Sequence, residues 1–373
     1  MTHGDPRPDA WLAEIVGQPA AMARAAAALV ARSDLLAGLA AARRPGAPIV
    51  LTGMGSSAAA CSAAATVLGG AGVLATPIET SELVHFRLPA LAASGTLVIV
   101  SQSGAGAEVL RLLDALASPP ARPFVVGVTN GDANPLALRA DVSFDTRAGT
   151  EAGPSSGTFA ATLVTLAAIV RVLGDAGRDA AEIASEVRAL ASAAAGALAA
   201  VLASGPDTAA LLDAALAGRE HRVILGRGTA RAAADVGALT IKEAAAIGYE
   251  AQDPAAFRHG PLELAGPRLG AVIIALDPAT APLDMALGAE IAAAGSGVVL
   301  IGRTGVPAGD GTPASRTVAS PPGVVAIPIP TVDELLAPAL ALAPLQLLAH
   351  RLAVGAGRRP GILVRATKVT LRE

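Results

Sequence analysis

The sequence of 373 residues is poor in cysteine, in aromatic side chains and in net charge, and each shortage excludes a class of protein. Its single cysteine, Cys61, excludes an internal disulfide framework and a zinc site built from cysteines. Five Phe, one Trp and one Tyr leave few rings for stacking on nucleic-acid bases or sugar rings. A formal net charge of −3 argues against a nucleic-acid partner.

Lysine is also scarce. Of the 28 basic residues, only Lys242 and Lys368 are lysines, and all the others are arginines. Arginine stays charged, whereas a lysine can lose its proton and attack a carbonyl carbon. The two lysines are therefore candidates for chemistry that the arginines cannot perform.

Hydrophobic runs long enough to cross a membrane are absent as well. Residues 158–170 and 335–349 form the longest apolar runs, and both are shorter than the ~20 residues that a membrane helix needs. Residues 1–9 lack the apolar core of a signal peptide. With 53% apolar and 16% charged residues, the chain is too apolar for a disordered protein. We expect a cytoplasmic protein with no membrane partner, in which both runs are buried helices.

What the sequence does contain is an alternation of strands and helices. Short apolar runs end in turns rich in Gly and Ser, and Ala-rich helical stretches such as 58–68 and 107–117 follow two of them. The expected strands are 49–51, 96–100, 124–128, 222–225, 271–276 and 298–301. This alternation predicts an α/β fold with parallel sheets covered by helices on both faces.

The pattern occurs twice. Gly53 and Gly226 end corresponding strands 173 residues apart, and Gly127 and Gly302 repeat the relation at 175 residues. Two tandem doubly wound, flavodoxin-like units explain these offsets. The predicted boundaries are N-terminal helices at 1–47, a first unit at 48–200, a second unit at 201–345 and a helix end with a tail at 346–373.

Serines follow two strands of the first unit. Ser56 and Ser57 come after the strand at 49–51, and Ser101 and Ser103 after the next one. Hydroxyls and free N–H groups at helix N-termini suit a phosphate group. The sequence lacks the glycine fingerprints of dinucleotide and nucleoside triphosphate sites. The alternative interpretation is that these serines only cap helices and shape turns.

The second unit carries groups suited to moving protons. Glu243 shares an apolar stripe with Val236 and Leu239 in a helix predicted over 235–248. Burial there would raise the pKa of Glu243 toward the range of a general base, unless the residue simply pairs with an arginine. His259 lies in a loop bounded by Gly and Pro, where an imidazole can reach a ligand.

Together these motifs resemble the tandem sugar isomerase (SIS) domain family. Its members include the isomerase half of glucosamine-6-phosphate synthase and the stand-alone glucosamine- and galactosamine-6-phosphate deaminase/isomerases. The resemblance rests on Gly55-Ser56-Ser57, Ser101-Gln102-Ser103-Gly104, Ala148-Gly149-Thr150-Glu151, Lys242-Glu243 and Arg258-His259-Gly260-Pro261.

The resemblance implies a hexose phosphate ligand and no metal or other cofactor. Glu243 would move a proton between C1 and C2 during aldose–ketose conversion. His259 would assist ring opening in the neighbouring subunit's site, which implies a homodimer with shared active sites. Lys368 would contact the open-chain sugar or form a Schiff base with it. The residues implied in substrate binding are Gly55, Ser56, Ser57, Ser101, Gln102 and Ser103.

Two departures from the family pattern concern the substrate. Gly106 stands where many members have a hydroxyl that contacts the phosphate, and Thr240 replaces a lysine of the synthases. We also expect no glutaminase half, because that half begins with a cysteine nucleophile and this sequence begins Met1-Thr2.

The resulting hypothesis is an isomerase or deaminase of an aminohexose or ketohexose 6-phosphate. A non-catalytic sugar-phosphate-binding regulatory protein is the alternative. A dehydrogenase is a third hypothesis, because a doubly wound sheet is a generic fold, but the missing dinucleotide fingerprint disfavours it.

Overall fold

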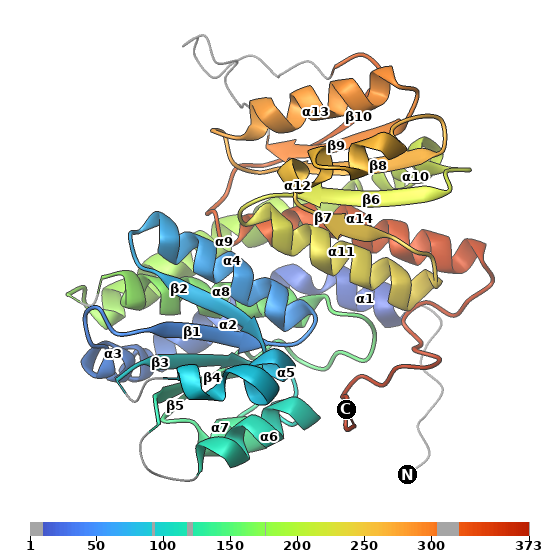
Figure 1. The fold of residues 1–373 in the computed structure, drawn as a ribbon. Coiled ribbons are helices and arrows are strands. Elements are labelled where there is room, and N and C mark those ends of the chain that lie inside the picture. Colours follow the sequence, from blue (N-terminus) through green and yellow to red (C-terminus); the bar gives the residue numbers. More distant parts are fainter. Residues whose placement is uncertain (1–9, 92–93, 118–121, 176, 304–320, 373) are drawn as a thin grey trace. The chain divides into compact units, whose positions relative to one another are not determined.

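The structure, a computed structural model, describes residues 10–91, 94–117, 122–175, 177–303 and 321–372 (Figure 1). Its contacts divide the chain into two compact units, each built around one parallel sheet. The first-sheet unit comprises the described residues of 17–151, 155–195 and 363–373, and the second-sheet unit those of 1–16, 152–154 and 196–362. This division interleaves the chain, whereas the boundaries expected from the sequence are contiguous; those boundaries stay predictions.

The first sheet has five parallel strands in the order β2-β1-β3-β4-β5. Its middle strands are continuous buried apolar runs, as expected where helices cover both faces of a sheet. The register sets Ile49 of β1 opposite Ala75 of β2 and Thr96 of β3. The strands are β1 (Ile49–Gly53), β2 (Ala75–Glu79), β3 (Thr96–Val100), β4 (Phe124–Thr129) and β5 (Val142–Asp145).

Helices cover both faces of this sheet (Figure 1). One face packs its apolar side chains against α6, including Val109 and Leu112, and against the short helices beside it. The other face is covered by α4 and by α8, which packs on α2. The helices are α2 (Gln18–Ala31), α3 (Ser33–Ala42), α4 (Ser56–Gly70), α5 (Thr80–Glu82), the π-helix η1 (Leu83–Arg87), the 3₁₀-helix η2 (Leu88–Ala90), α6 (Ala107–Leu116), α7 (Pro135–Arg139), α8 (Gly157–Gly174) and α9 (Ala180–Ala203), which continues into the second-sheet unit.

The second sheet repeats this plan. Its parallel strands follow the order β10-β9-β8-β6-β7, so that β6 takes the place of β1 and β8 the place of β3. The strands are β6 (His221–Gly226), β7 (Glu250–Gln252), β8 (Leu269–Ala275), β9 (Gly297–Arg303) and β10 (Val324–Ile329). Val223, Ile273 and Leu287 belong to the core on one face, and α14 covers α11 on the other. The helices are α1 (Ala10–Val16), α10 (Gly205–Leu216), α11 (Ala230–Ala245), α12 (Pro254–Arg258), the 3₁₀-helix η3 (Pro261–Leu264), α13 (Ala281–Ala293) and α14 (Ala337–Gly355).

The predicted fold class is confirmed. Both sheets are parallel and flanked by helices, and every strand expected from the sequence is present. The repeat is confirmed as well, since Gly53 and Gly226 end β1 and β6, while Gly127 and Gly302 lie in β4 and β9. Four further strands, β2, β5, β7 and β10, were not predicted from the sequence, and they are the four sheet edges.

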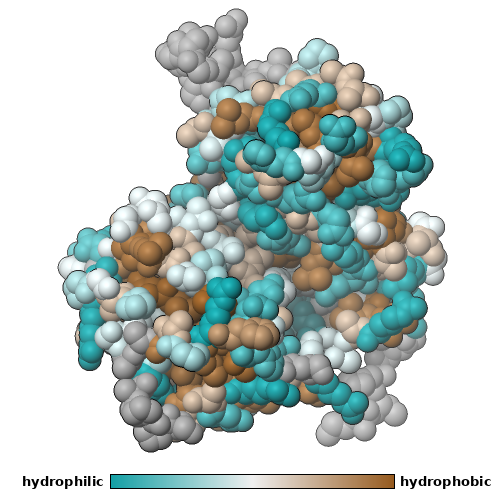
Figure 2. Space-filling model, viewed as in Figure 1, coloured by the Kyte–Doolittle hydropathy of each residue, from teal (hydrophilic) through white to brown (hydrophobic). Residues whose placement is uncertain are grey.

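Three described helices, α8, α9 and α14, have the length and composition of a membrane span. Most of the apolar stretch of α8 and of α14 is buried inside the protein, as expected for the two longest runs, whereas only a third of that of α9 is. On the visible face, apolar and hydrophilic side chains alternate in small patches (Figure 2). Large apolar residues of the first-sheet unit that are exposed include Leu74, Phe86 and Leu138.

Candidate functional site

The two serine loops, residues 53–57 and 101–104, lie at one point of the first sheet. They follow β1 and β3, which are adjacent strands. From β1 the chain goes to β2 on one side, and β3 lies on the other, so the strand order reverses direction between β1 and β3. In open α/β sheets this reversal at the carboxyl ends is where ligands bind. The structure therefore brings together the serines that the sequence singled out.

The loop after β1 approaches β3 closely. Gly53 ends the strand, and a Cβ at this position would lie 2.8 Å from Ser57 Cβ and 2.9 Å from the carbonyl oxygen of Val100. Gly55 has φ +54°, a left-handed conformation that glycine adopts at little cost. Ser56 and Ser57 are then the first two residues of α4, and both are half-buried. Glycine thus permits a tight turn that presents a helix N-terminus at the strand end.

The loop after β3 is held by its own side chains. Ser101 Oγ accepts a hydrogen bond from the Gly104 N–H at 3.2 Å, and Ser103 Oγ accepts one from the Ala105 N–H at 3.3 Å. Gly104 has φ +60°, and a Cβ there would overlap Asn134 Oδ1. The carbonyl oxygen of Gln102 accepts from the Asn130 N–H at 3.0 Å. These serines shape the turn, as the alternative interpretation holds, and each hydroxyl keeps its proton available for donation.

The C-terminal tail reaches the N-terminus of α6. The Ala107 N–H donates to the carbonyl oxygen of Thr370 at 3.0 Å. A Cβ at Gly106 would lie 3.7 Å from Glu108 Oε2 and 3.9 Å from that same carbonyl. The tail therefore occupies a helix N–H that could otherwise hold an anion, beside the position where a family hydroxyl is missing.

Lys368 pairs with a buried carboxylate that the sequence did not place in the site. Lys368 Nζ lies 2.7 Å from Glu151 Oε2, and the two side chains are 27% and 3% exposed. Glu151 belongs to the quoted Ala148–Glu151 motif, which was the only signal that could have revealed it. Because 217 residues separate the partners, spacing gives no hint of the pair.

A chain of hydroxyls joins Glu151 to the first serine loop. Ser56 Oγ donates to Ser155 Oγ at 3.1 Å, and Ser155 Oγ lies 3.1 Å from Thr158 Oγ1. Thr158 Oγ1 donates to Glu151 Oε2 at 2.5 Å. The second serine loop instead lies before α6, where the tail bonds to Ala107. Lys368 and the first serine loop thus form one hydrogen-bonded cluster.

Glu243 lies in the second-sheet unit, on the last turns of α11. Its side chain is half-buried rather than buried, because the stripe it shares with Val236 is only partly covered beyond Leu239. The helix ends at Ala245, before the predicted end at 248, with Ala246 in the left-handed conformation. The neighbouring Lys242 is exposed, and its Nζ lies 3.7 Å from Glu250 Oε1 at the start of β7.

His259 lies in the same unit, after β7 in the chain. It follows α12 after the carboxyl end of β7, is exposed, and donates its backbone N–H to the Ala256 carbonyl at 3.0 Å. Glu243 is thirteen residues into α11, about 20 Å along the helix from its start near the carboxyl end of β6. In the chain, β7 and α12 separate the two residues.

The carboxyl edge of the second sheet carries a different cluster. Arg227 follows β6, and its Nε lies 2.8 Å from Asp284 Oδ1 on α13. Asp284 is 1% exposed, and burial raises the pKa of its carboxyl to about 6, although Arg227 lowers it. The carboxylates of Asp253 and Asp277 raise it further. A positive and a negative group thus neutralise each other at the place that the serines occupy in the first sheet.

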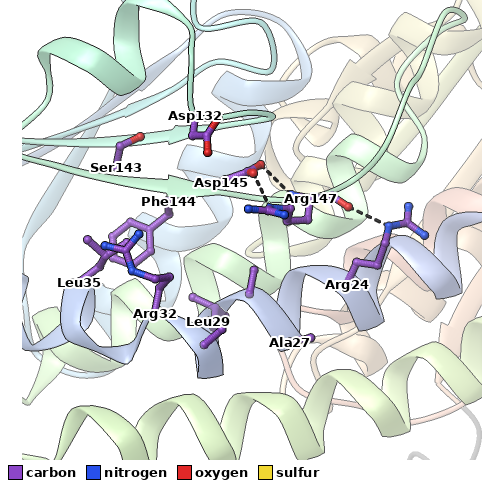
Figure 3. Close-up of a pocket in the computed structure, with 12 residues that line it drawn as sticks. Arg24, Ala27, Leu29, Arg32, Leu35, Asp132, Ser143, Phe144, Asp145 and Arg147 are labelled. Carbon is purple, nitrogen blue, oxygen red and sulfur yellow. Dashed lines mark hydrogen bonds and ion pairs between the residues drawn. The ribbon is translucent and has the colours of Figure 1, made fainter.

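A pocket of about 470 Å³ lies elsewhere in the first-sheet unit, between α2 and the end of β5 (Figure 3). Arg24, Arg32, Asp145 and Arg147 contribute its polar wall, and no residue predicted for the site lines it. In the described part of the chain, no group of three or more His, Cys, Asp or Glu residues is arranged to hold a metal ion. Through Arg147 the pocket borders the loop that leads to Glu151.

Comparison with known proteins supplies the family. The model of the SIS domain matches residues 45–172 and 215–308, one stretch in each repeat. These stretches amount to more than half of the chain. The chain belongs to the SIS domain family.

One curated relative of this SIS protein matches nearly its whole length. Glutamine–fructose-6-phosphate aminotransferase [isomerizing] of Pyrobaculum aerophilum is 30% identical over 354 residues, which cover 95% of this chain. The same alignment covers only 56% of the relative, so the chain spans about half the length of that protein.

Solved structures share the fold of this SIS protein. The C-terminal domain of glucosamine-fructose-6-phosphate aminotransferase from Francisella tularensis has a TM-score of 0.79 at 23% identity, covering 94% of this chain and 97% of that one. Tagatose-6-phosphate ketose/aldose isomerase from Escherichia coli has a TM-score of 0.75 at 20% identity, covering 94% and 95%. At these identities the likeness establishes a tandem SIS fold.

Proposed function

We propose that this SIS protein is a cytoplasmic sugar-phosphate isomerase or deaminase acting on an aminohexose or ketohexose 6-phosphate. The observation that carries the proposal is the cluster at the carboxyl edge of the first sheet, where the serine loops at the β1/β3 reversal adjoin an ion-paired lysine. The names of the relatives, which act on hexose 6-phosphates, support the same substrate class.

In this proposal the first-sheet unit binds the substrate. The N-terminus of α4 and the hydroxyls of Ser57 and Ser103 donate hydrogen bonds to the phosphate, whose negative charge the helix dipole favours. Gly55, Ser56, Ser101 and Gln102 shape and complete this cradle. Lys368 contacts the open-chain sugar, and its amine can attack the carbonyl carbon to form a Schiff base.

Proton transfer falls to the second-sheet unit. Glu243 moves a proton between C1 and C2, and His259 assists ring opening. The resemblance to the SIS family implies that His259 reaches the partner subunit's site, and on that ground we propose a homodimer with shared active sites.

The test is turnover of glucosamine 6-phosphate and fructose 6-phosphate by Glu243→Gln. Removing the base should lower kcat by about 10²–10⁴-fold while substrate binding persists. Glu220→Gln is the control, since Glu220 is exposed and its carboxylate lies 3.3 Å from the exposed Arg268 guanidinium. Unchanged turnover in Glu243→Gln would exclude Glu243 as the base.

A thermal-shift series with hexose and aminohexose 6-phosphates separates enzyme from sensor. Binding at 100 times Kd stabilises the folded chain by about 2.7 kcal/mol. Stabilisation without turnover by the wild type would support the alternative of a non-catalytic sugar-phosphate-binding protein. No stabilisation with any of them would contradict both.

A further inference from the structure

We propose that Glu151 is a positioning residue that holds the Lys368 amine beside the first serine loop. The inference rests on the proposed function, because it assigns the residue through which Lys368 would meet the sugar. It concerns the fourth residue of the Ala148–Glu151 motif, to which the proposed mechanism gives no role.

The Glu151 carboxylate is held in one orientation. Its Oε1 atom accepts hydrogen bonds from the Ser156 N–H at 2.8 Å, the Ser156 hydroxyl at 2.9 Å and the Thr158 N–H at 3.1 Å. Its Oε2 atom accepts from the Thr158 hydroxyl at 2.5 Å and from Lys368 Nζ at 2.7 Å. A buried carboxylate with donors on both oxygens cannot turn without leaving a donor unpaired, which is costly inside a protein. Lys368 therefore binds to a rigid acceptor.

The loop that carries Glu151 is fixed from the other side. Arg24 on α2 donates through Nε to the carbonyl oxygen of Arg147 at 2.9 Å (Figure 3). A second guanidinium nitrogen of Arg24 donates to the carbonyl of Ala148. Asn130 donates to the Gly149 carbonyl at 2.8 Å and accepts from the Ala148 N–H at 2.9 Å. The backbone just before Glu151 is thus bonded to α2 and to the loop after β4.

The tail, in contrast, has little order of its own. Residues 363–372 form neither helix nor strand, and Thr370 is bonded through its carbonyl to Ala107. A lysine side chain on such a segment has many rotamers, and ordering it carries a large entropy cost. The bond to Glu151 selects one of them before substrate arrives, which is what preorganisation of a reacting group requires.

The same carboxylate connects the amine to the phosphate cradle. Through Thr158 and Ser155, the hydroxyl chain ends at Ser56 on the first turn of α4. The distance between the phosphate and Lys368 is therefore set by one continuous hydrogen-bonded path. A purely structural ion pair would stabilise the unit without fixing that distance.

The first experiment uses the scarcity of lysine. Trace labelling with acetic anhydride, read by peptide mass spectrometry, gives the acetylation rate of Lys368 relative to Lys242 in one sample. In Glu151→Gln the amine loses its charged acceptor, and we expect this ratio to rise at least tenfold. The matched control is Glu220→Gln, which removes an exposed carboxylate paired with Arg268 and should leave the ratio unchanged.

The second experiment reads function. We expect Glu151→Gln to lower kcat for the sugar phosphate at least 100-fold, with KM within threefold, because the phosphate cradle stays intact. Glu151→Asp, which keeps the charge on a shorter arm, should recover part of kcat and part of the protection of Lys368. Should Glu151→Gln not fold, Glu151→Asp alone decides, since an unchanged labelling ratio and unchanged kcat would both contradict the proposal.

The two readouts separate the two levels of the argument. Labelling needs no turnover, so a labelling ratio that does not change in folded Glu151→Gln overturns the role of Glu151 whatever the reaction is. Absence of turnover in the wild type, with the labelling change present, would overturn the proposed function and leave the positioning of Lys368 standing. A matched fall of kcat and rise of KM would indicate a structural role and contradict the proposal.

Discussion

The carboxyl edges of the two sheets have the same topology and different chemistry. At the reversal between β1 and β3, half-buried serines lie at helix starts, and the tail adds Lys368. At the matching reversal between β6 and β8, Arg227 forms an ion pair with buried Asp284. One edge offers hydroxyls and N–H groups to an anion, whereas the other neutralises its own charge. The repeated fold supplies the place, and the loops decide whether it is a site.

The two edges also differ in how their buried carboxylates are satisfied. Glu151 has hydrogen-bond donors on both oxygens, whereas Asp284 Oδ2 is buried without a hydrogen-bond partner among the described residues. An unpaired buried oxygen disfavours the charged form. The carboxyl edge of the first sheet therefore holds a carboxylate with donors on both oxygens, and that of the second sheet holds one whose pKa burial raises to about 6.

The largest expected effect is a loss of substrate affinity when a negative charge is placed at the carboxyl edge of the first sheet. Ser57→Asp puts a carboxylate at the second residue of α4, where the phosphate is proposed to bind. Two like charges about 4 Å apart near a protein surface repel by about 4 kcal/mol, which corresponds to about a thousandfold loss of affinity. Calorimetric titration with glucosamine 6-phosphate measures it.

The second edge provides the matched change. Arg231 is the second residue of α11, as Ser57 is of α4, and it pairs with Asp235 at 2.8 Å. Arg231→Ser should leave the affinity for glucosamine 6-phosphate within twofold. Equal losses in both variants would mean that the two edges are not functionally distinct.

A smaller effect concerns the pH dependence of the second edge. Burial raises the pKa of Asp284 from 3.8 to about 6, so the folded unit holds a proton that the unfolded chain releases. Its contribution to stability is complete below pH 3.8 and is lost as pH rises through about 6. Relative to Asp284→Asn, the wild type should lose about 3 kcal/mol across this window. Urea unfolding at pH 4, 5, 6 and 7, followed by the fluorescence of Trp11, measures the difference.

The amide of Asp284→Asn does not titrate, so this variant provides the reference for the wild type. A stability difference between wild type and Asp284→Asn that is constant from pH 4 to 7 would contradict the role assigned to burial of Asp284.

The sequence could predict the central strands of each sheet but not the strands at its two sides. The central strands are continuous apolar runs such as 96–100, because helices cover both of their faces. All four missed strands are the outermost strands of their sheets, and β2 and β7 have few buried residues. Pro77 inside β2 and the three-residue length of β7 further weaken their pattern. A half-exposed strand does not differ enough from a loop in local sequence.

Only part of the candidate site could likewise be predicted from the sequence. The serine loops could be found because strand ends and helix starts are local patterns. The partnership of Lys368 with Glu151 could not, since it joins residues 217 positions apart through tertiary packing. Nor could helical spacing show that Glu243 is only half-buried near the end of α11, because periodicity gives the face of a helix and says nothing about what covers it.

The smallest expected effect uses one native probe in each unit. Cys61 lies on α4 of the first-sheet unit with 1% exposure, and burial raises the pKa of its thiol, so it reacts only when that unit opens. Trp11 is 2% exposed in the second-sheet unit and donates to the Pro154 carbonyl at 3.1 Å.

Inorganic phosphate at ten times its Kd should stabilise the first-sheet unit by about 1.4 kcal/mol, slowing alkylation of Cys61 about tenfold. In urea, phosphate should shift the unfolding midpoint reported by Trp11 fluorescence no more than chloride does at equal ionic strength. Protection of Trp11 equal to that of Cys61 would show that phosphate also binds the second edge.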